Sequence, residues 1–316
     1  MTARELLSIL LFGAVAALLP VLVTSGTWQN FAVFMLIICL AAQGWNILGG
    51  YGGQYSFGHA AFFGTAAYAT SIMQIRYGVN PYLGFIAGVL LAALVGWVIG
   101  FLAFRSGLRG SYFALVTLAF AEVFRVLANA SAFTGGAAGI LIPLDVRPAN
   151  FQFASRASFY WVALALVVAA LVITRMLERS RLGAQLVAVR ENEDAARALG
   201  VDAMGVKLKA IGLSAGITGA AGALYAQYFL YLDSGIAYGT WISVETLLAP
   251  IIGGAGTVFG PVIGGIVLHA LSEFTRTLVG RIPGLDVAIF GVLLILVVRF
   301  PPRELPGLLR LGRWRR

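Results

Sequence analysis

The chain alternates long apolar segments with short polar connections. A helix needs about 20 apolar residues to cross the hydrocarbon core of a bilayer. Ten segments reach or approach that length, a few of them short: Leu6–Val23, Phe31–Leu48, His59–Ile75, Tyr82–Phe104, Ser111–Leu127, Phe159–Leu177, Ala210–Leu232, Ile242–Gly254, Pro261–Leu278 and Leu285–Phe300. The pattern predicts an all-α polytopic membrane protein, with about ten transmembrane helices in a single domain over residues 1–316.

The composition supports a membrane environment. Of the 316 residues, 60% are hydrophobic and 11% are charged, against about 45–50% apolar and about 25% charged in a soluble domain. A soluble fold of this size could not bury so much apolar surface. The single cysteine, Cys39, lies in an apolar segment, can form no intrachain disulfide and is expected only to pack.

The basic residues predict an orientation. If the N-terminus is cytoplasmic and the spans alternate, most of the 22 Lys and Arg residues fall on the cytoplasmic side, mainly in the connection 178–209 and the tail 301–316. We therefore expect both termini to be cytoplasmic, the first segment to be a retained span and the tail to lie on the anionic inner leaflet. The same rule explains the net charge of +9 without nucleic acid, because the charges are dispersed over several loops.

Two glycine-rich stretches interrupt the helical pattern. They are Gly49–Gly58 (GGYGGQYSFG), called here the first break, and Gly253–Gly260 (GGAGTVFG), the second break, beside which Pro250 and Pro261 are expected to limit helix continuity. Irregular backbone at membrane depth persists only where protein or a water-lined cavity provides hydrogen-bond partners for its N–H and C=O groups. Such breaks therefore often mark transport routes. Close helix packing through small residues is the alternative, and both interpretations stay open.

Ionisable and polar residues within spans are further candidates for a pathway. Glu122 lies in the outer half of its segment and has two interpretations, a structural pair with Arg125 or a role in transport. Glu245 lies near the outer end of its segment. His269 is alone on an apolar segment and is expected to be structural, and no cluster has metal-ligand spacing. The candidate pathway residues are Gln54, Ser56, His59, Glu122, Glu245, Gly253, Gly254 and Gly256.

A polar stretch, RENEDAARALGVDAMGVKLKA (residues 190–210), separates two apolar segments and falls on the cytoplasmic side. Asn192 is a good N-cap, acidic residues occupy the first turn, and Gly200 is a suitable stop. The stretch therefore predicts a helix of about two turns. Small and charged side chains suit a docking element, although an ordinary connecting loop would have the same pattern.

Several motifs resemble one family. Asp194, Ala195 and Ala196, followed after three residues by Gly200, resemble the EAA…G signature of ABC importer permeases, with Asp in place of Glu. Further similar stretches lie in the first break with the helix after it, in residues 108–125 and 133–140, in residues 181–226 and in the second break. Together they resemble the LivM-type permease subunits of branched-chain amino-acid importers, a family that includes permeases for urea and short amides.

The resemblance implies a transport subunit rather than an enzyme. Its implied partners are a second, LivH-like permease, two cytoplasmic ATPase subunits and an external substrate-binding protein, in a bacterial inner membrane. It implies that ATP and Mg²⁺ bind to the ATPases and no cofactor to this chain, and the chain lacks a G-x-x-x-x-G-K-[ST] phosphate loop. The residues implied to couple to the ATPase are Arg190, Glu191, Asn192, Glu193, Asp194, Ala195, Ala196, Leu199 and Gly200.

Three alternatives stay open at this point. The chain could belong to a same-family permease for urea, amides, sugars or other amino acids. It could be an autonomous secondary transporter or channel. The spacing of Ser56 and His59 is also compatible with an intramembrane hydrolase, but spacing alone supplies no oxyanion site.

Overall fold

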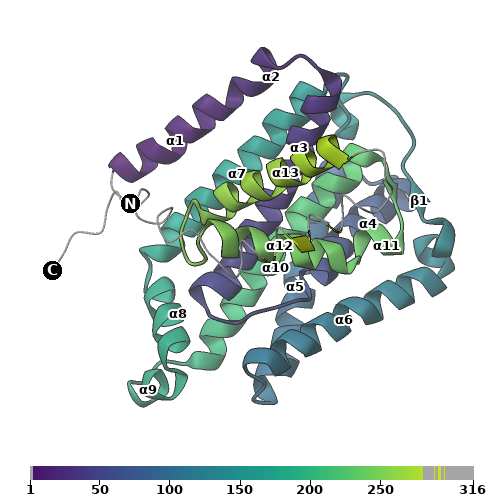
Figure 1. Cartoon of the computed structure of the whole chain (residues 1–316). Helices are drawn as coiled ribbons and strands as arrows, with labels where there is room; N and C mark the ends of the chain where they lie inside the picture. The colour runs from purple at the N-terminus through teal and green to yellow at the C-terminus, as the bar shows by residue number, and fades with distance from the viewer. Residues whose placement is uncertain (1–2, 280–287, 289–290, 293–294, 296–316) are drawn as a thin grey trace.

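The computed structural model describes residues 3–279, 288, 291–292 and 295, and shows a bundle of helices (Figure 1). The tenth predicted segment and the basic tail lie almost entirely outside these residues. The principal helices are α1 (Ala3–Ala17), α3 (Gly26–Trp45), α4 (His59–Tyr77), α5 (Pro81–Arg105), α6 (Gly110–Ala130), α7 (Arg156–Glu178), α8 (Arg181–Glu191), α9 (Glu193–Ala198), α10 (Ala203–Phe229), α12 (Thr240–Gly253) and α13 (Gly260–Val279).

Short elements complete the described chain. The helices α2 (Leu19–Leu22) and α11 (Ser234–Ala237) join longer ones. A pair of two-residue strands, β1 (Ile140–Leu141) and β2 (Tyr231–Leu232), aligns antiparallel with Ile140 opposite Leu232. These strands fasten the connection after α6 to the end of α10.

Each of the nine apolar segments within residues 3–279 is helical, as the sequence predicts. Within the described residues, however, six helical stretches are long and apolar enough to cross a membrane, so the count of about ten transmembrane helices is not confirmed. Two helices outside this group, α4 and α10, lie in the interior and bury polar residues such as Thr70, Ser214 and Gln227. Because protein surrounds them, they do not need the uniformly apolar surface that lipid demands.

Small residues bring these central helices into close contact. A Cβ atom on Gly222 of α10 would lie 2.0 Å from the carbonyl oxygen of Phe63 on α4. On the same helix, a Cβ on Gly219 would lie 2.6 Å from the Cβ of Ala92 on α5. Glycines at such positions let helix backbones approach closely, which is a common way to pack helices in membranes.

The N-terminal end of α1 lies on the same side of the bundle as the connection 178–209. Glu5 forms ion pairs with Arg175 and Arg179, at the end of α7 that leads into α8. The β1–β2 pair lies at the opposite end of the bundle, where α6 and α10 finish. This arrangement agrees with the predicted sidedness of the N-terminus relative to the polar connection.

The first break begins as a widened helix rather than as irregular chain, which corrects the sequence prediction. Residues Asn46–Tyr51 form a π-helix, here η1, that continues α3, and the irregular stretch begins at Gly52. Cβ atoms on Gly49 and Gly50 would lie 2.4 Å from the Trp45 ring and 2.2 Å from Asn46 Oδ1. The glycines therefore make room for two large side chains, and the wide turn accommodates them.

The second break begins at the end of α12, at Gly253, as the predicted segment Ile242–Gly254 indicates. Helix α12 runs through Pro250 to Gly253, because proline removes only one backbone donor and Gly254 N closes the next turn on Pro250 O at 2.8 Å. Pro261 lies in the first turn of α13, where a backbone N–H would have no partner within the helix and its absence costs nothing. The expectation that Pro250 limits helix continuity is therefore wrong, and Gly254, with φ of 110°, makes the turn.

The α4–α10 contact gives a direct test of this packing. We expect Gly222→Ala to lower the free energy of unfolding in detergent by about 1–3 kcal/mol, because the new methyl group overlaps a backbone oxygen. Gly212, on the same helix, is the control: a Cβ there has its nearest neighbour at 4.0 Å. Gly212→Ala should be neutral or stabilise by up to about 1 kcal/mol through helix propensity. Equal effects of the two substitutions on thermal unfolding would contradict the packing argument.

Candidate coupling element and glycine-rich breaks

Side-chain caps define the polar connection after α7. Ser180 Oγ accepts from Gly183 N at the start of α8, Asn192 Oδ1 accepts from Ala195 N at the start of α9, and Asp202 Oδ1 accepts from Gly205 N at the start of α10. Gly200 follows α9 with φ of 85°. The short helix, its N-cap and its glycine stop are therefore confirmed.

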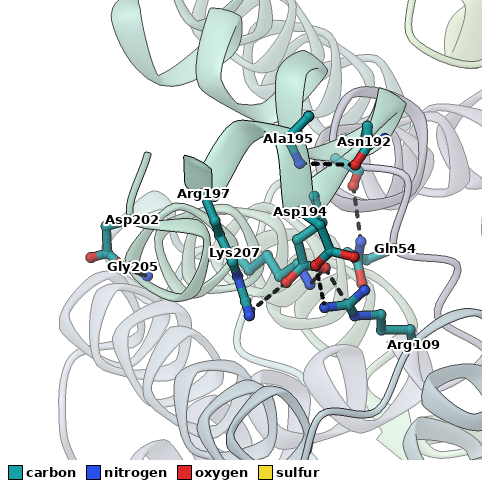
Figure 2. A network of polar contacts seen from close by, with 11 residues as sticks. Gln54, Arg109, Asn192, Asp194, Ala195, Arg197, Asp202, Gly205 and Lys207 are labelled. Carbon is teal, nitrogen blue, oxygen red and sulfur yellow. Dashed lines mark hydrogen bonds and ion pairs between the residues drawn. The ribbon is translucent and has the colours of Figure 1, made fainter. Parts of the chain in front are cut away.

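Glu193 is the centre of an ion network that holds α9 against the bundle. Figure 2 shows its basic partners Arg109, Arg197 and Lys207 close to one another. Glu193 Oε2 lies 2.5 Å from Lys207 Nζ on α10 and 3.3 Å from Arg109 Nε before α6, and Glu193 Oε1 lies 2.6 Å from Arg197 Nη2. The side chains of Glu193 and Lys207 are only 9% and 4% exposed, and Lys207 also lies over the Phe104 ring. Three cations therefore converge on one largely buried carboxylate.

Asp194 lies beside this network but faces outward, with 76% of its side chain exposed. Arg109 Nη2 donates to its Oδ1 at 3.2 Å, and this hydrogen bond lowers the pKa of the Asp194 carboxyl. The carboxylate therefore stays charged at neutral pH. Asp in the place of Glu keeps a negative charge on the outer surface of α9.

The alanines of α9 divide between two faces. Ala196 is 3% exposed and packs against the chain itself, whereas Ala195 is exposed. Leu199, just after the helix, is 86% exposed, among the most exposed large apolar side chains of the described residues. The outward surface of the element thus includes Asp194, Ala195 and Leu199.

Arg190 joins the end of α8 to the first break. Its Nη1 donates to Gly50 O at 2.9 Å, while Nη2 and Nε donate to Glu191 Oε1. A Cβ on Gly53 would lie 2.5 Å from Arg190 Cγ, and one on Gly256 would lie 3.3 Å from Nη1. The arginine is therefore packed between both glycine breaks.

Side-chain amides of α3 and η1 hold the two breaks together. Asn46 Nδ2 donates to Thr257 O at 2.9 Å, and Asn46 Oδ1 accepts from Gly256 N at 2.7 Å. Gln43 Nε2 donates to Val258 O at 2.8 Å. Irregular backbone of the second break thereby finds its partners on α3 and η1, 210 or more residues earlier in the sequence.

The polar candidates of the first break, Gln54, Ser56 and His59, are buried, and each forms hydrogen bonds with residues outside this group. His59 Nε2 lies 2.9 Å from Ser214 Oγ on α10, whereas Ser56 Oγ accepts from Gly58 N and Ser56 O accepts from Trp45 Nε1. Gln54 Nε2 donates to Gly52 O. The structure therefore assigns Ser56 and His59 to separate structural hydrogen bonds, which gives no support to the hydrolase alternative.

The two carboxylates of the candidate pathway have different surroundings. Glu122 is paired with Arg125, with Nε 3.0 Å from Oε1 and 2.9 Å from Oε2, as the sequence suggests. Glu245 on α12 is largely buried, with Oε2 3.9 Å from Nε2 of His269 on α13. The two carboxylates lie on different helices, and no contact joins them.

Sequence reasoning passed over four residues that hold this region together: Gln43, Asn46, Arg109 and Lys207. The signal for Gln43 and Asn46 is an amide side chain in an apolar segment just before a break. For Arg109 and Lys207, the sequence shows only two basic residues among those that predict the orientation. Their contacts are formed across large sequence separations, which local patterns do not reveal.

Comparison with known proteins decides the family. Residues 27–298 match the family model described as branched-chain amino acid transport system / permease component. The chain belongs to this permease family.

Individual relatives agree. The permease is 31% identical over 301 residues to the high-affinity branched-chain amino acid transport permease protein LivM of Escherichia coli K12, covering 87% of this chain and 69% of the relative. It is 25% identical to the probable LivM of Methanocaldococcus jannaschii, covering 77% and 75%, and 24% identical to LivH of Salmonella typhimurium, covering 83% and 89%. No solved structure is recognisably similar. The permease is thus a membrane transport subunit and not a catalytic enzyme.

The Glu193 network of the permease can be tested by unfolding. We expect Glu193→Gln to lower the free energy of unfolding in detergent by about 3–5 kcal/mol, because it leaves the buried Lys207 without its carboxylate. The double variant Glu193→Gln/Lys207→Met should recover much of that loss. Asp194→Asn, on the exposed neighbour, is the control and should leave the unfolding curve unchanged. If single and double variants unfold alike, Lys207 does not depend on Glu193.

Proposed function

We propose that this chain is one of two permease subunits of an ATP-driven importer of branched-chain amino acids in the bacterial inner membrane. It forms half of the translocation pathway, and an external binding protein delivers the substrate. Both termini and the connection 178–209 face the cytoplasm. Membership of the permease family and the resemblance to LivM and LivH support this assignment.

The observation that carries the coupling role is the construction of α9. It is short, exposed on one side and fixed on the other by a buried ion network to α10 and to the start of α6. An apolar side chain that is 86% exposed, Leu199, is the kind of feature that a partner protein covers. We infer that a cytoplasmic ATPase docks on Asp194, Ala195 and Leu199, with Arg190, Glu191, Asn192, Glu193, Ala196 and Gly200 shaping the element.

Two ATPase subunits, with ATP and Mg²⁺ bound to them, supply the energy in this proposal. Their closure on ATP moves α9 and α8, and Arg190 conveys the movement to both glycine breaks. The residues proposed for the pathway are Gln54, Ser56, His59, Glu122, Glu245, Gly253, Gly254 and Gly256. Uptake of urea or a short amide through the complete transporter, in competition with leucine, would distinguish the same-family alternative.

Docking is tested by assembly with the ATPase. We expect Leu199→Ser and Ala195→Trp to reduce co-purification of the ATPase and binding-protein-stimulated ATP hydrolysis, while the permease still inserts and folds. Leu144, 74% exposed in the connection at the opposite end of the bundle, provides the control, and Leu144→Ser should leave ATPase co-purification intact.

Ala196 is unsuitable for this test, because a bulky residue there would disturb the permease's own packing. Normal assembly of both α9 variants would refute the docking role. Transport by the permease reconstituted alone, without any ATPase, would favour an autonomous transporter.

A further inference from the structure

Helix α6 lies at the edge of the bundle and buries only a narrow part of its surface (Figure 1). The buried residues are Phe113, Ala114, Thr117, Ala121 and Ala128. A wide apolar face is exposed and includes Tyr112, Leu115, Val123, Val126 and Leu127. Between these two faces, helical spacing aligns Ser111, Glu122, Arg125 and Asn129, called here the α6 stripe, with Leu118 on the same line.

The charged pair of the α6 stripe lies within a helix that is long and apolar enough to span a membrane. Glu122 is eight residues from the end of α6 at Ala130, or about 12 Å at the rise of an α-helix. Its side chain is 48% exposed and that of Arg125 is 38% exposed. Charged side chains within spans are costly against lipid, and they almost always face the bundle interior or a water-filled cavity.

The neighbouring helix α5 shows what a lipid-facing surface looks like in this chain. Its exposed side chains include Leu83, Ile86, Leu90, Leu94 and Trp97, and no charged residue occurs between Tyr82 and Phe104. Both helices are long and apolar enough to span a membrane. The α6 stripe therefore meets a different environment from the exposed face of α5.

Helix α6 is also connected to the first break. Thr117 Oγ1 accepts from Phe57 N at 3.2 Å, and a Cβ on Gly58 would lie 2.2 Å from Thr117 O. The helix that bears the charged pair thus rests directly on the backbone at Phe57 and Gly58. A movement of the first break would therefore displace α6.

We propose that Glu122 and Arg125 form a substrate station for zwitterionic α-amino acids, on a water-lined wall that faces the second permease subunit. Glu122 binds the ammonium group of the solute and Arg125 binds its carboxylate. Each side chain thereby replaces its ion pair with the other by an ion pair with the solute. An exposed ion pair has little net stability, so it opens readily and does not retain the solute. This inference rests on the proposed function and adds the site and the charge pattern of its ligand.

The first experiment measures water access in the complete transporter. In a Cys39→Ala background, Glu122→Cys and Arg125→Cys are treated with a charged, membrane-impermeant methanethiosulfonate, and Leu94→Cys on α5 serves as the lipid-facing control. We expect positions 122 and 125 to react at least ~10-fold faster than position 94, since water reaches only the α6 stripe. Leucine-loaded binding protein should slow both reactions. Reactivity equal to that of position 94 would overturn the proposal.

The second experiment separates a substrate contact from a merely structural pair. We expect Glu122→Gln to reduce leucine uptake at least ~10-fold while binding-protein-stimulated ATP hydrolysis continues, because only the ammonium partner is lost. Glu178→Gln is the matched control, since Glu178 forms an i,i+3 pair with Arg175 at the end of α7 beside α8. Unchanged uptake by Glu122→Gln would also overturn the proposal.

These results remain distinguishable from failure of the proposed function. If the unsubstituted complex shows no ATP-dependent leucine uptake, the proposed function is wrong, whatever the thiol reactivities are. If that complex transports leucine but positions 122 and 125 react no faster than position 94, only the substrate station is wrong.

Discussion

Backbone N–H and C=O groups inside a membrane must find partners within the protein, and this constraint governs the region around the two glycine-rich breaks. Each break interrupts a helix and so releases backbone groups that the helix would have paired. Asn46 accepts from Gly256 N and donates to Thr257 O, and Gln43 donates to Val258 O. The second break is therefore stabilised by α3 and η1, the helical segments that lead into the first break.

Arg190 connects the polar connection 178–209 to the first break. Arg190 ends α8, donates to Gly50 O and packs against Gly53. The planar guanidinium has several donors in a fixed arrangement, so that it bonds to Gly50 O and to Glu191 at the same time. A push on α9 would thus reach the junction of both breaks through one side chain and one backbone carbonyl, without passing through the closely packed α4–α10 core.

Local patterns were sufficient for much of this architecture, and their failures have physical reasons. Asn192 and Gly200 predicted the limits of α9 correctly, because capping depends on neighbours within one turn. The π-helix at Asn46 was missed, because it depends on how Trp45 and Asn46 fit over glycines. The count of about ten spans stays a prediction: six helical stretches of the described residues are long and apolar enough to cross a membrane, and α4 and α10, which bury polar residues inside the bundle, are not among them. The convergence of Arg109, Arg197 and Lys207 on Glu193 depends partly on contacts across long separations, which no sequence window contains.

The stability of the docking surface comes from outside α9. A helix of six residues is not stable in water by its own hydrogen bonds, because the free-energy cost of nucleation exceeds the gain from so few bonds. Its N-cap and the ion pairs of Glu193 with α10 and Arg109 hold it in place. In the proposed function, a partner that binds Leu199 and Ala195 would meet a helix that is fixed by ion pairs to α10 and to the start of α6. The Glu193 carboxylate therefore connects α9 both to α10, in the interior of the bundle, and to the start of α6, the helix that carries the Glu122–Arg125 pair.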